Sequence, residues 1–173
     1  MKLFAVVLIA SAISAAAALP SSVRAADDGL RVGLVLPVQF GTFPGCPTGA
    51  ALYQVVSRHS SGSGTTCLLS DPDFTPCAEG LGLCRDLPTQ TVLDLRQGEI
   101  EFDANQHEVI TGFDPGTGTV TFQITWTGTV TAGTHKYGKL AGADVSGGGS
   151  TSFDANGTQT GDLSFVIGEA DDS

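Results

Sequence analysis

Residues 119–131 read TVTFQITWTGTVT, and apolar and polar side chains alternate through the stretch. The odd positions carry threonine or glutamine. The even positions carry the apolar side chains Val120, Phe122, Ile124, Trp126 and Val130, with Gly128 as the one interruption. Because successive side chains of a strand point to opposite faces, this pattern predicts a strand with one apolar face. The run is longer than the usual strand of about 5–6 residues, and an internal glycine is typical of a bulge, so we expect a bent strand of a barrel or sandwich.

Shorter apolar runs on both sides predict further strands, at residues 30–40, 51–58, 91–95, 99–102, 108–113, 137–145, 150–153 and 162–167. Residues that favour turns connect several of them, at 103–106, 114–118, 132–134 and 154–157. Short links between sequential strands make an antiparallel meander, and about eight such strands can close into a barrel that leaves no free edge. The predicted fold is therefore all-β, an antiparallel meander that closes as an eight-stranded barrel.

The N-terminus predicts export. Lys2 precedes an apolar run from Leu3 to Leu19, and Val23 and Ala25 occupy the positions that a signal peptidase reads. We expect residues 1–25 to be a cleaved signal peptide and residues 26–173 to be one domain, secreted to the extracellular space or the periplasm. The alternative is a retained membrane anchor, but the run falls short of the ~20 apolar residues that a spanning helix needs, and no second stretch of that length follows.

The chain is acidic, with a formal net charge of −10. Such a surface repels phosphate backbones and anionic lipids, which disfavours nucleic acid and membrane surfaces as partners. We expect the charge to serve solubility.

Four cysteines, Cys46, Cys67, Cys77 and Cys84, predict two disulfides, because an even number of cysteines in an exported chain is typical of cross-links. A zinc site is disfavoured, since no two of them have the C-x2-C spacing of zinc ligands. Three pairings are open, of which Cys46–Cys67 with Cys77–Cys84 closes the shortest loops. Residues from about 59 to 88, which begin with a serine- and glycine-rich stretch, are expected to form an irregular loop that the disulfides hold.

No set of residues predicts catalysis, a cofactor or a metal. The histidines lie beside predicted turns and no Gly-x-Ser-x-Gly motif accompanies them; they are His59, His107 and His135. Glu99 and Glu101 share a strand face that we expect to meet solvent. Asp144 or Asp162 could act as a catalytic acid only if buried. Residues 154–157 resemble the start of a calcium loop, but Phe165 stands where the bidentate acid belongs, so we expect a turn there.

Residues 126–147 read WTGTVTAGTHKYGKLAGADVSG and resemble a strand-turn-strand unit of the allene oxide cyclase and dirigent β-barrels and their exported bacterial relatives. Gly133 and Thr134 match the turn, Lys136 and Tyr137 match its basic and aromatic positions, and Gly142 matches the later glycine. His135 stands where the family has a glycine. The resemblance implies an eight-stranded barrel, and no catalytic residue of that family can be placed on this chain.

These observations leave three hypotheses for function. The leading one is a non-enzymatic exported barrel that binds a small apolar ligand or has a structural role, with Phe122 and Trp126 lining its cavity. An eight-stranded barrel is just wide enough to be filled by its own side chains. We therefore expect these two residues to help fill a packed core and not to line a cavity. The alternatives are a cyclase- or dirigent-type enzyme and a protein-interaction module that uses the disulfide loop.

Overall fold

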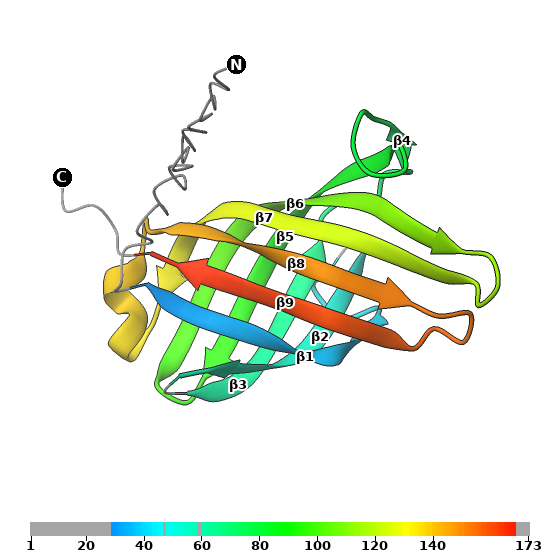
Figure 1. The fold of residues 1–173 in the computed structure, drawn as a ribbon. Coiled ribbons are helices and arrows are strands. Elements are labelled where there is room, and N and C mark those ends of the chain that lie inside the picture. The colour runs from blue at the N-terminus through cyan, green and yellow to red at the C-terminus, as the bar shows by residue number, and fades with distance from the viewer. Residues whose placement is uncertain (1–28, 47, 59, 169–173) are drawn as a thin grey trace, which may run out of the picture.

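The computed structural model describes residues 29–46, 48–58 and 60–168, and these form a β-barrel with one short helix (Figure 1). The elements are β1 (Leu30–Gly41), β2 (Gly49–Ser57), β3 (Ser61–Leu68), β4 (Thr75–Pro76), β5 (Leu83–Leu95), β6 (Gly98–Asp114), β7 (Thr119–Gly133), the 3₁₀ helix η1 (His135–Leu140), β8 (Asp144–Phe153) and β9 (Gln159–Ile167). The predicted signal peptide and His59 lie outside the described residues. Within the described residues, no helix has the length and apolar character needed to cross a membrane.

The strands follow the order β3-β2-β1-β9-β8-β7-β6-β5, and β3 pairs with β5 to close the ring. That closing pair is antiparallel and runs from Gly62 opposite Leu95 to Leu68 opposite Thr89. The two-residue strand β4 lies outside the ring and pairs only with the start of β5. The predicted closed, eight-stranded antiparallel barrel is confirmed.

Strand β6 corrects one sequence prediction, because the turn expected at residues 103–106 does not exist. Gly98–Asp114 is continuous, and Asp103 pairs with Gln90 on one side and with Thr129 on the other. Ala104 points inward and is buried, whereas Asp103 and Asn105 are exposed. The local turn preference of this stretch is overridden by hydrogen bonding to strands on both sides.

Helix η1 corrects a second prediction, since residues 137–145 were expected to form one strand. Residues i and i+3 of a 3₁₀ helix lie on the same side, and in η1 these are Tyr137 and Leu140, both buried in the main core. The helix therefore caps one end of the barrel, which we call the closed end. The first strand also starts there, with Leu30 paired to Ile167.

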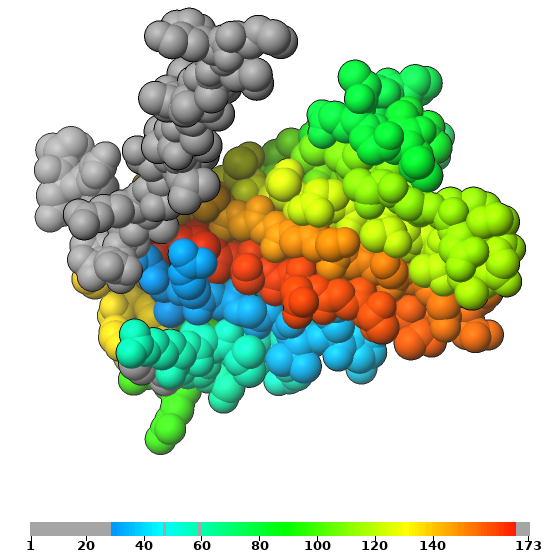
Figure 2. All heavy atoms as spheres, in the orientation of Figure 1, coloured from blue at the N-terminus to red at the C-terminus, as the bar shows by residue number. Residues whose placement is uncertain are grey.

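The segment from 59 to 88 is also more ordered than expected. Ser61–Leu68 is strand β3 and Leu83 begins β5, so the irregular chain is confined to residues 69–82 around β4. In Figure 2 this segment stands out from the barrel wall. The glycine at position 64 is needed for packing, because a Cβ there would lie 2.1 Å from the ring of Tyr53.

The opposite end of the barrel, which we call the open end, carries residues 69–82, the β1–β2 connection, and the β6–β7 and β8–β9 turns (Figure 1). Both disulfides lie at this end. Cys46–Cys67 joins the β1–β2 connection to β3, and Cys77–Cys84 joins residues 69–82 to β5. The predicted disulfides are confirmed, with the pairing that closes the shortest loops. The expectation that both bridges lie within one irregular loop was wrong, because each bridge joins a loop residue to a strand residue.

Candidate functional site

A cavity of about 330 Å³ lies inside the open end of the barrel. This volume is at the lower end of the roughly 300–1,000 Å³ that is usual for small-molecule sites. Apolar side chains form most of the wall, and the aromatic ones are Phe40, Tyr53, Phe74, Phe122, Trp126, Phe153 and Phe165. The expectation of a fully packed interior is therefore wrong for the open half of the barrel.

The mouth of the cavity is lined by a row of phenylalanines. Ring centroids are 6.2 Å apart for Phe40 and Phe153, 6.0 Å for Phe153 and Phe122, and 6.1 Å for Phe122 and Phe74. These rings come from β1, β8, β7 and the 69–82 segment, so residues far apart in the sequence build one aromatic rim. Phe40 is 64% exposed, which marks the outer edge of this rim.

The floor of the cavity is formed by Trp126 and Phe165, whose ring centroids are 4.8 Å apart. Phe165 also packs edge-on against Phe102 at 5.2 Å, and Phe102 belongs to the packed core of the closed half. The structure thus places both residues predicted from the sequence, Phe122 at the mouth and Trp126 at the floor, in the cavity lining.

One wall of the cavity carries an ion pair. Arg85 on β5 donates from Nε to Oε2 of Glu108 on β6 at 2.6 Å, and from an Nη atom to Oδ1 of Asp71 at 2.8 Å. The Arg85 guanidinium also lies 4.5 Å above the ring of Phe74. The Glu108 side chain is only 9% exposed, and a carboxylate that is buried to this extent is stabilised only when it is paired and hydrogen-bonded.

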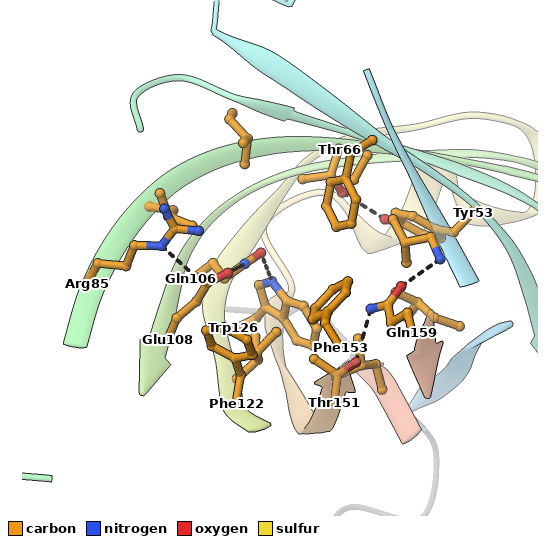
Figure 3. Close-up of a pocket in the computed structure, with 18 of the residues that line it drawn as sticks. Tyr53, Thr66, Arg85, Gln106, Glu108, Phe122, Trp126, Thr151, Phe153 and Gln159 are labelled. Atoms are coloured by element: carbon orange, nitrogen blue, oxygen red, sulfur yellow. Dashed lines mark hydrogen bonds and ion pairs between the residues drawn. The ribbon is translucent and has the colours of Figure 1, made fainter. Parts of the chain in front are cut away.

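Gln106 connects this ion pair to the floor of the cavity (Figure 3). The indole N–H of Trp126 donates to Oε1 of Gln106 at 2.8 Å, and the Gln106 amide donates to Oε1 of Glu108. A buried indole needs an acceptor for its N–H, and here the acceptor is itself held by a charged group. The orientation of Trp126 is therefore fixed by the Arg85–Glu108 pair.

Uncharged polar groups lie on the other side of the cavity (Figure 3). The hydroxyl of Tyr53 is 2.8 Å from that of Thr66, which is in turn 2.8 Å from that of Thr91. Burial raises the pKa of Tyr53 to about 12, so the phenol is uncharged at neutral pH. Gln159 donates to Thr151 at 3.1 Å and accepts from the backbone N–H of Val38 at 2.8 Å.

The polar groups of the cavity are thus held by one another. In the described part of the chain, every buried side-chain nitrogen or oxygen has a hydrogen-bond partner. The site therefore offers a fixed apolar volume with a charged wall and a neutral polar wall, an arrangement suited to holding and orienting an apolar molecule.

The other residues considered from the sequence lie outside the cavity. His107 is on the outer face, where its Nδ1 is 3.0 Å from Asp86, and this hydrogen bond raises the pKa of His107. The hydrogen bond from Asn105 is the main cause of the lowered pKa of Asp86. The remaining candidates are all exposed; they are His135, Glu99, Glu101, Asp144 and Asp162. Glu99 and His135 line one shallow surface pocket at the closed end, away from the cavity.

Residues 154–157 form a turn, as expected. Oδ1 of Asp154 accepts the backbone N–H groups of Asn156 at 2.9 Å and of Thr158 at 2.8 Å, and the latter bond is the main reason why the pKa of Asp154 is lowered. Among the described residues, no three His, Cys, Asp or Glu side chains lie close enough together to hold a metal ion.

Sequence reasoning missed Arg85, Gln106 and Glu108 as site residues. The signal was present in β6, whose inward row continues from Phe102 and Ala104 to Gln106 and Glu108. Two polar residues in an apolar row point to a buried polar group that needs partners. The false turn at 103–106 divided this row and concealed its register.

No family model, curated protein or solved structure matches this chain. The resemblance to the allene oxide cyclase and dirigent proteins is therefore supported only at the level of the eight-stranded barrel. What this small, disulfide-bonded β-barrel does must be argued from its cavity.

Proposed function

We propose that this protein binds a small, mainly apolar ligand in the open end of its barrel. The observation that carries the proposal is the cavity of about 330 Å³, which has aromatic walls and a nearly buried ion pair fixed in one of them. The two disulfides fit an oxidising compartment, so we place this binding role outside the cytoplasm.

The contrast between the two halves of the barrel supports this function. Eight strands enclose a space that side chains can fill completely or that can hold one small ligand. The closed half is filled, with Phe102, Ile100 and Leu93 fully buried. Side chains that line an unfilled space lose the van der Waals contacts that close packing provides in the other half of the barrel. An apolar interior that is left unfilled at one end is therefore typical of a ligand site and not of a barrel with a structural role alone.

A thermal-shift screen with hydrophobic metabolites tests the proposal. A ligand that binds the folded state alone raises the melting temperature, because binding at 100 times Kd adds about 2.7 kcal/mol to the free energy of unfolding. We expect members of the screen to stabilise the protein. A panel in which no compound shifts the melting temperature would contradict the proposal.

A matched pair of variants locates the binding. Ala51 lines the cavity, whereas Gln54 on the same strand points outward and is exposed. Ala51→Phe places a ring in the cavity and should abolish the shift, and Gln54→Phe adds the same apolar ring to the outer surface and should leave it intact. Equal shifts in both variants would place the ligand elsewhere.

A cyclase- or dirigent-type enzyme would use the same cavity. Recovery of a chemically changed ligand after incubation favours this alternative, whereas recovery of the unchanged ligand favours binding alone.

A protein-interaction role is favoured by a different observation, the exposed leucines beside the disulfides. Leu69, Leu81 and Leu83 are 47%, 56% and 38% exposed, and all three belong to the 69–82 segment or to the start of β5. Exposed apolar groups that gather in one region are typical of contact surfaces. Replacement of the three leucines by serine should abolish such a contact and leave ligand binding in the cavity unchanged.

A further inference from the structure

The charges of the barrel are distributed unevenly between its two ends. In the part of the chain that the structure describes, Arg85 is the only lysine or arginine at the open end. The others are at the closed end, where acidic residues accompany them; they are Arg31, Arg58, Arg96, Lys136 and Lys139. Acidic residues dominate the open end; they are Asp71, Asp73, Glu79, Asp86, Glu108, Asp114 and Asp154.

The same excess of negative charge reaches into the cavity. Its lining contains one cation, Arg85, and two carboxylates, Asp71 and Glu108. Both carboxylates bind Arg85, so its positive charge is neutralised and one negative charge is left over. Asp71 is 53% exposed and lies at the mouth, where an entering molecule meets it first.

Like the excess of carboxylates, the aromatic rim favours a positively charged ligand. The face of an aromatic ring is negative and attracts a cation that lies within about 6 Å of its centre. Arg85 already uses the ring of Phe74 in this way, at 4.5 Å. Phe40, Phe122 and Phe153 continue the row around the mouth with the spacings given above.

Resting on the proposed binding function, we infer that the ligand is a lipophilic cation. Its apolar body would occupy the cavity above Trp126 and Phe165. Its amine or quaternary ammonium group would lie at the mouth, between Asp71 and the phenylalanine rings. The negative field of the open end would also speed the approach of such a ligand.

An anionic ligand of the same shape fits this site poorly. A carboxylate would have to compete with Asp71 and Glu108 for Arg85, and the loss of Arg85 would leave the nearly buried Glu108 unpaired. The net charge of −10 opposes the approach of an anion as well. A neutral molecule meets neither the attraction nor the repulsion, so we expect its affinity to be intermediate.

Tryptophan fluorescence tests this order with three probes that share one apolar chain: octylammonium, octanol and octanoate. The chain contains a single tryptophan, which is Trp126 at the floor of the cavity, so its emission reports on occupation of the site. We expect octylammonium to bind roughly tenfold more tightly than octanol, and octanoate to bind most weakly. Added salt should weaken the binding of octylammonium and leave that of octanol unchanged. Free N-acetyl-tryptophanamide is the control for direct quenching by the amine.

Two isosteric variants separate a local contact from net charge. Asp71→Asn removes the carboxylate at the mouth and retains an oxygen that can accept from Arg85. Asp73→Asn removes the same charge from the same segment at a residue that does not line the cavity. We expect Asp71→Asn to reduce the affinity for octylammonium by roughly threefold, the range of a partly exposed ion pair, and Asp73→Asn to leave it close to that of the wild type.

The possible results distinguish the failure of this inference from the failure of the proposed function. If octanol or octanoate binds as tightly as octylammonium, the cationic ligand is wrong and the binding cavity stands. Equal losses in Asp71→Asn and Asp73→Asn also overturn the assigned contact. If none of the three probes alters the emission of Trp126, the proposed function itself is overturned.

Discussion

At the scale of single residues, the cavity depends on polar side chains that are held in an apolar wall. Glu108 is stable there because Arg85 and Gln106 both donate to it. Tyr53 is stable because its hydroxyl bonds to Thr66 and its ring packs against Gly64. Each of these residues therefore combines a structural role with a position in the lining.

Tyr53 makes the stability of the barrel sensitive to alkaline pH. The pKa of Tyr53 is about 12 in the folded protein and 10.0 in the unfolded chain. The contribution of the uncharged phenol to the free energy of unfolding is therefore complete below pH 10 and is lost as the pH rises through about 12. Two pKa units correspond to about 3 kcal/mol. Tyr53→Phe removes this titration, at a cost of about 1 kcal/mol at neutral pH for the lost hydrogen bond.

Urea unfolding measured from pH 8 to 11.5 checks this prediction. We expect the stability of the wild type to fall more steeply than that of Tyr53→Phe above pH 10, by about 2 kcal/mol at pH 11.5, so that the two curves cross within this range. Curves that remain parallel throughout would show that the phenol is not protected by burial.

At the scale of elements, the sequence predicted best those elements that depend least on contacts with residues distant in the sequence. β7 was predicted almost completely because its period-two pattern continues on both sides of Gly128, which stays in register opposite Ala104 and Val145. β6 was divided at residues 103–106, because a turn-like tetrapeptide adopts a strand once β5 and β7 pair with it. η1 was missed because the reason for it is tertiary: Tyr137 and Leu140 cap the core.

β3 was missed because its serine- and glycine-rich composition resembles that of a flexible linker. Its small residues allow close packing, and a Cβ at position 64 would lie 2.1 Å from Tyr53, which the hydrogen bond to Thr66 holds in place.

The candidate site was predictable only in part. Phe122 and Trp126 follow from the pattern of β7, whereas Arg85 and Glu108 require the correct register of β5 against β6.

The tight packing of β3 leads to a prediction about Gly64. Gly64→Ala should destabilise the protein by about 1–3 kcal/mol, the usual cost of overpacking a core, because the Tyr53 ring cannot move without losing its hydrogen bond. Ser63→Ala is the matched control, since Ser63 is exposed on the outer face of the same strand. Chemical denaturation of both variants measures the difference. A fully stable Gly64→Ala protein would contradict the account of β3.

At the scale of the whole molecule, the barrel has one end that provides stability and one that provides the site. The closed end contains the fully packed core and η1. The open end contains the cavity, the aromatic rim, the excess of acidic residues and both disulfides. The disulfides therefore hold the loops that surround the mouth.

The two bridges should differ in their effects when each is replaced by a pair of serines. Cys46–Cys67 spans 21 residues of sequence and Cys77–Cys84 spans 7, and a longer closed loop constrains the unfolded chain more. We expect loss of Cys46–Cys67 to lower the melting temperature more. Loss of Cys77–Cys84 should lower the affinity for octylammonium more, because it loosens the segment that carries Asp71 and Phe74. Thermal melts and Trp126 titrations of both variants measure this, and the reverse ranking in either measurement would contradict it.

The central claim, that the open half of the barrel is a ligand site, is tested most directly by nuclear Overhauser effects between protein and probe. Octanol is the suitable probe, since it carries no charge and so tests the cavity alone. We predict intermolecular contacts from octanol protons to the Trp126 indole at the floor and to the Phe122 ring at the mouth, and their loss in Ala51→Phe. Contacts confined to an exposed ring outside the cavity such as Phe113, which is 59% exposed, or no contacts at all, would contradict the account.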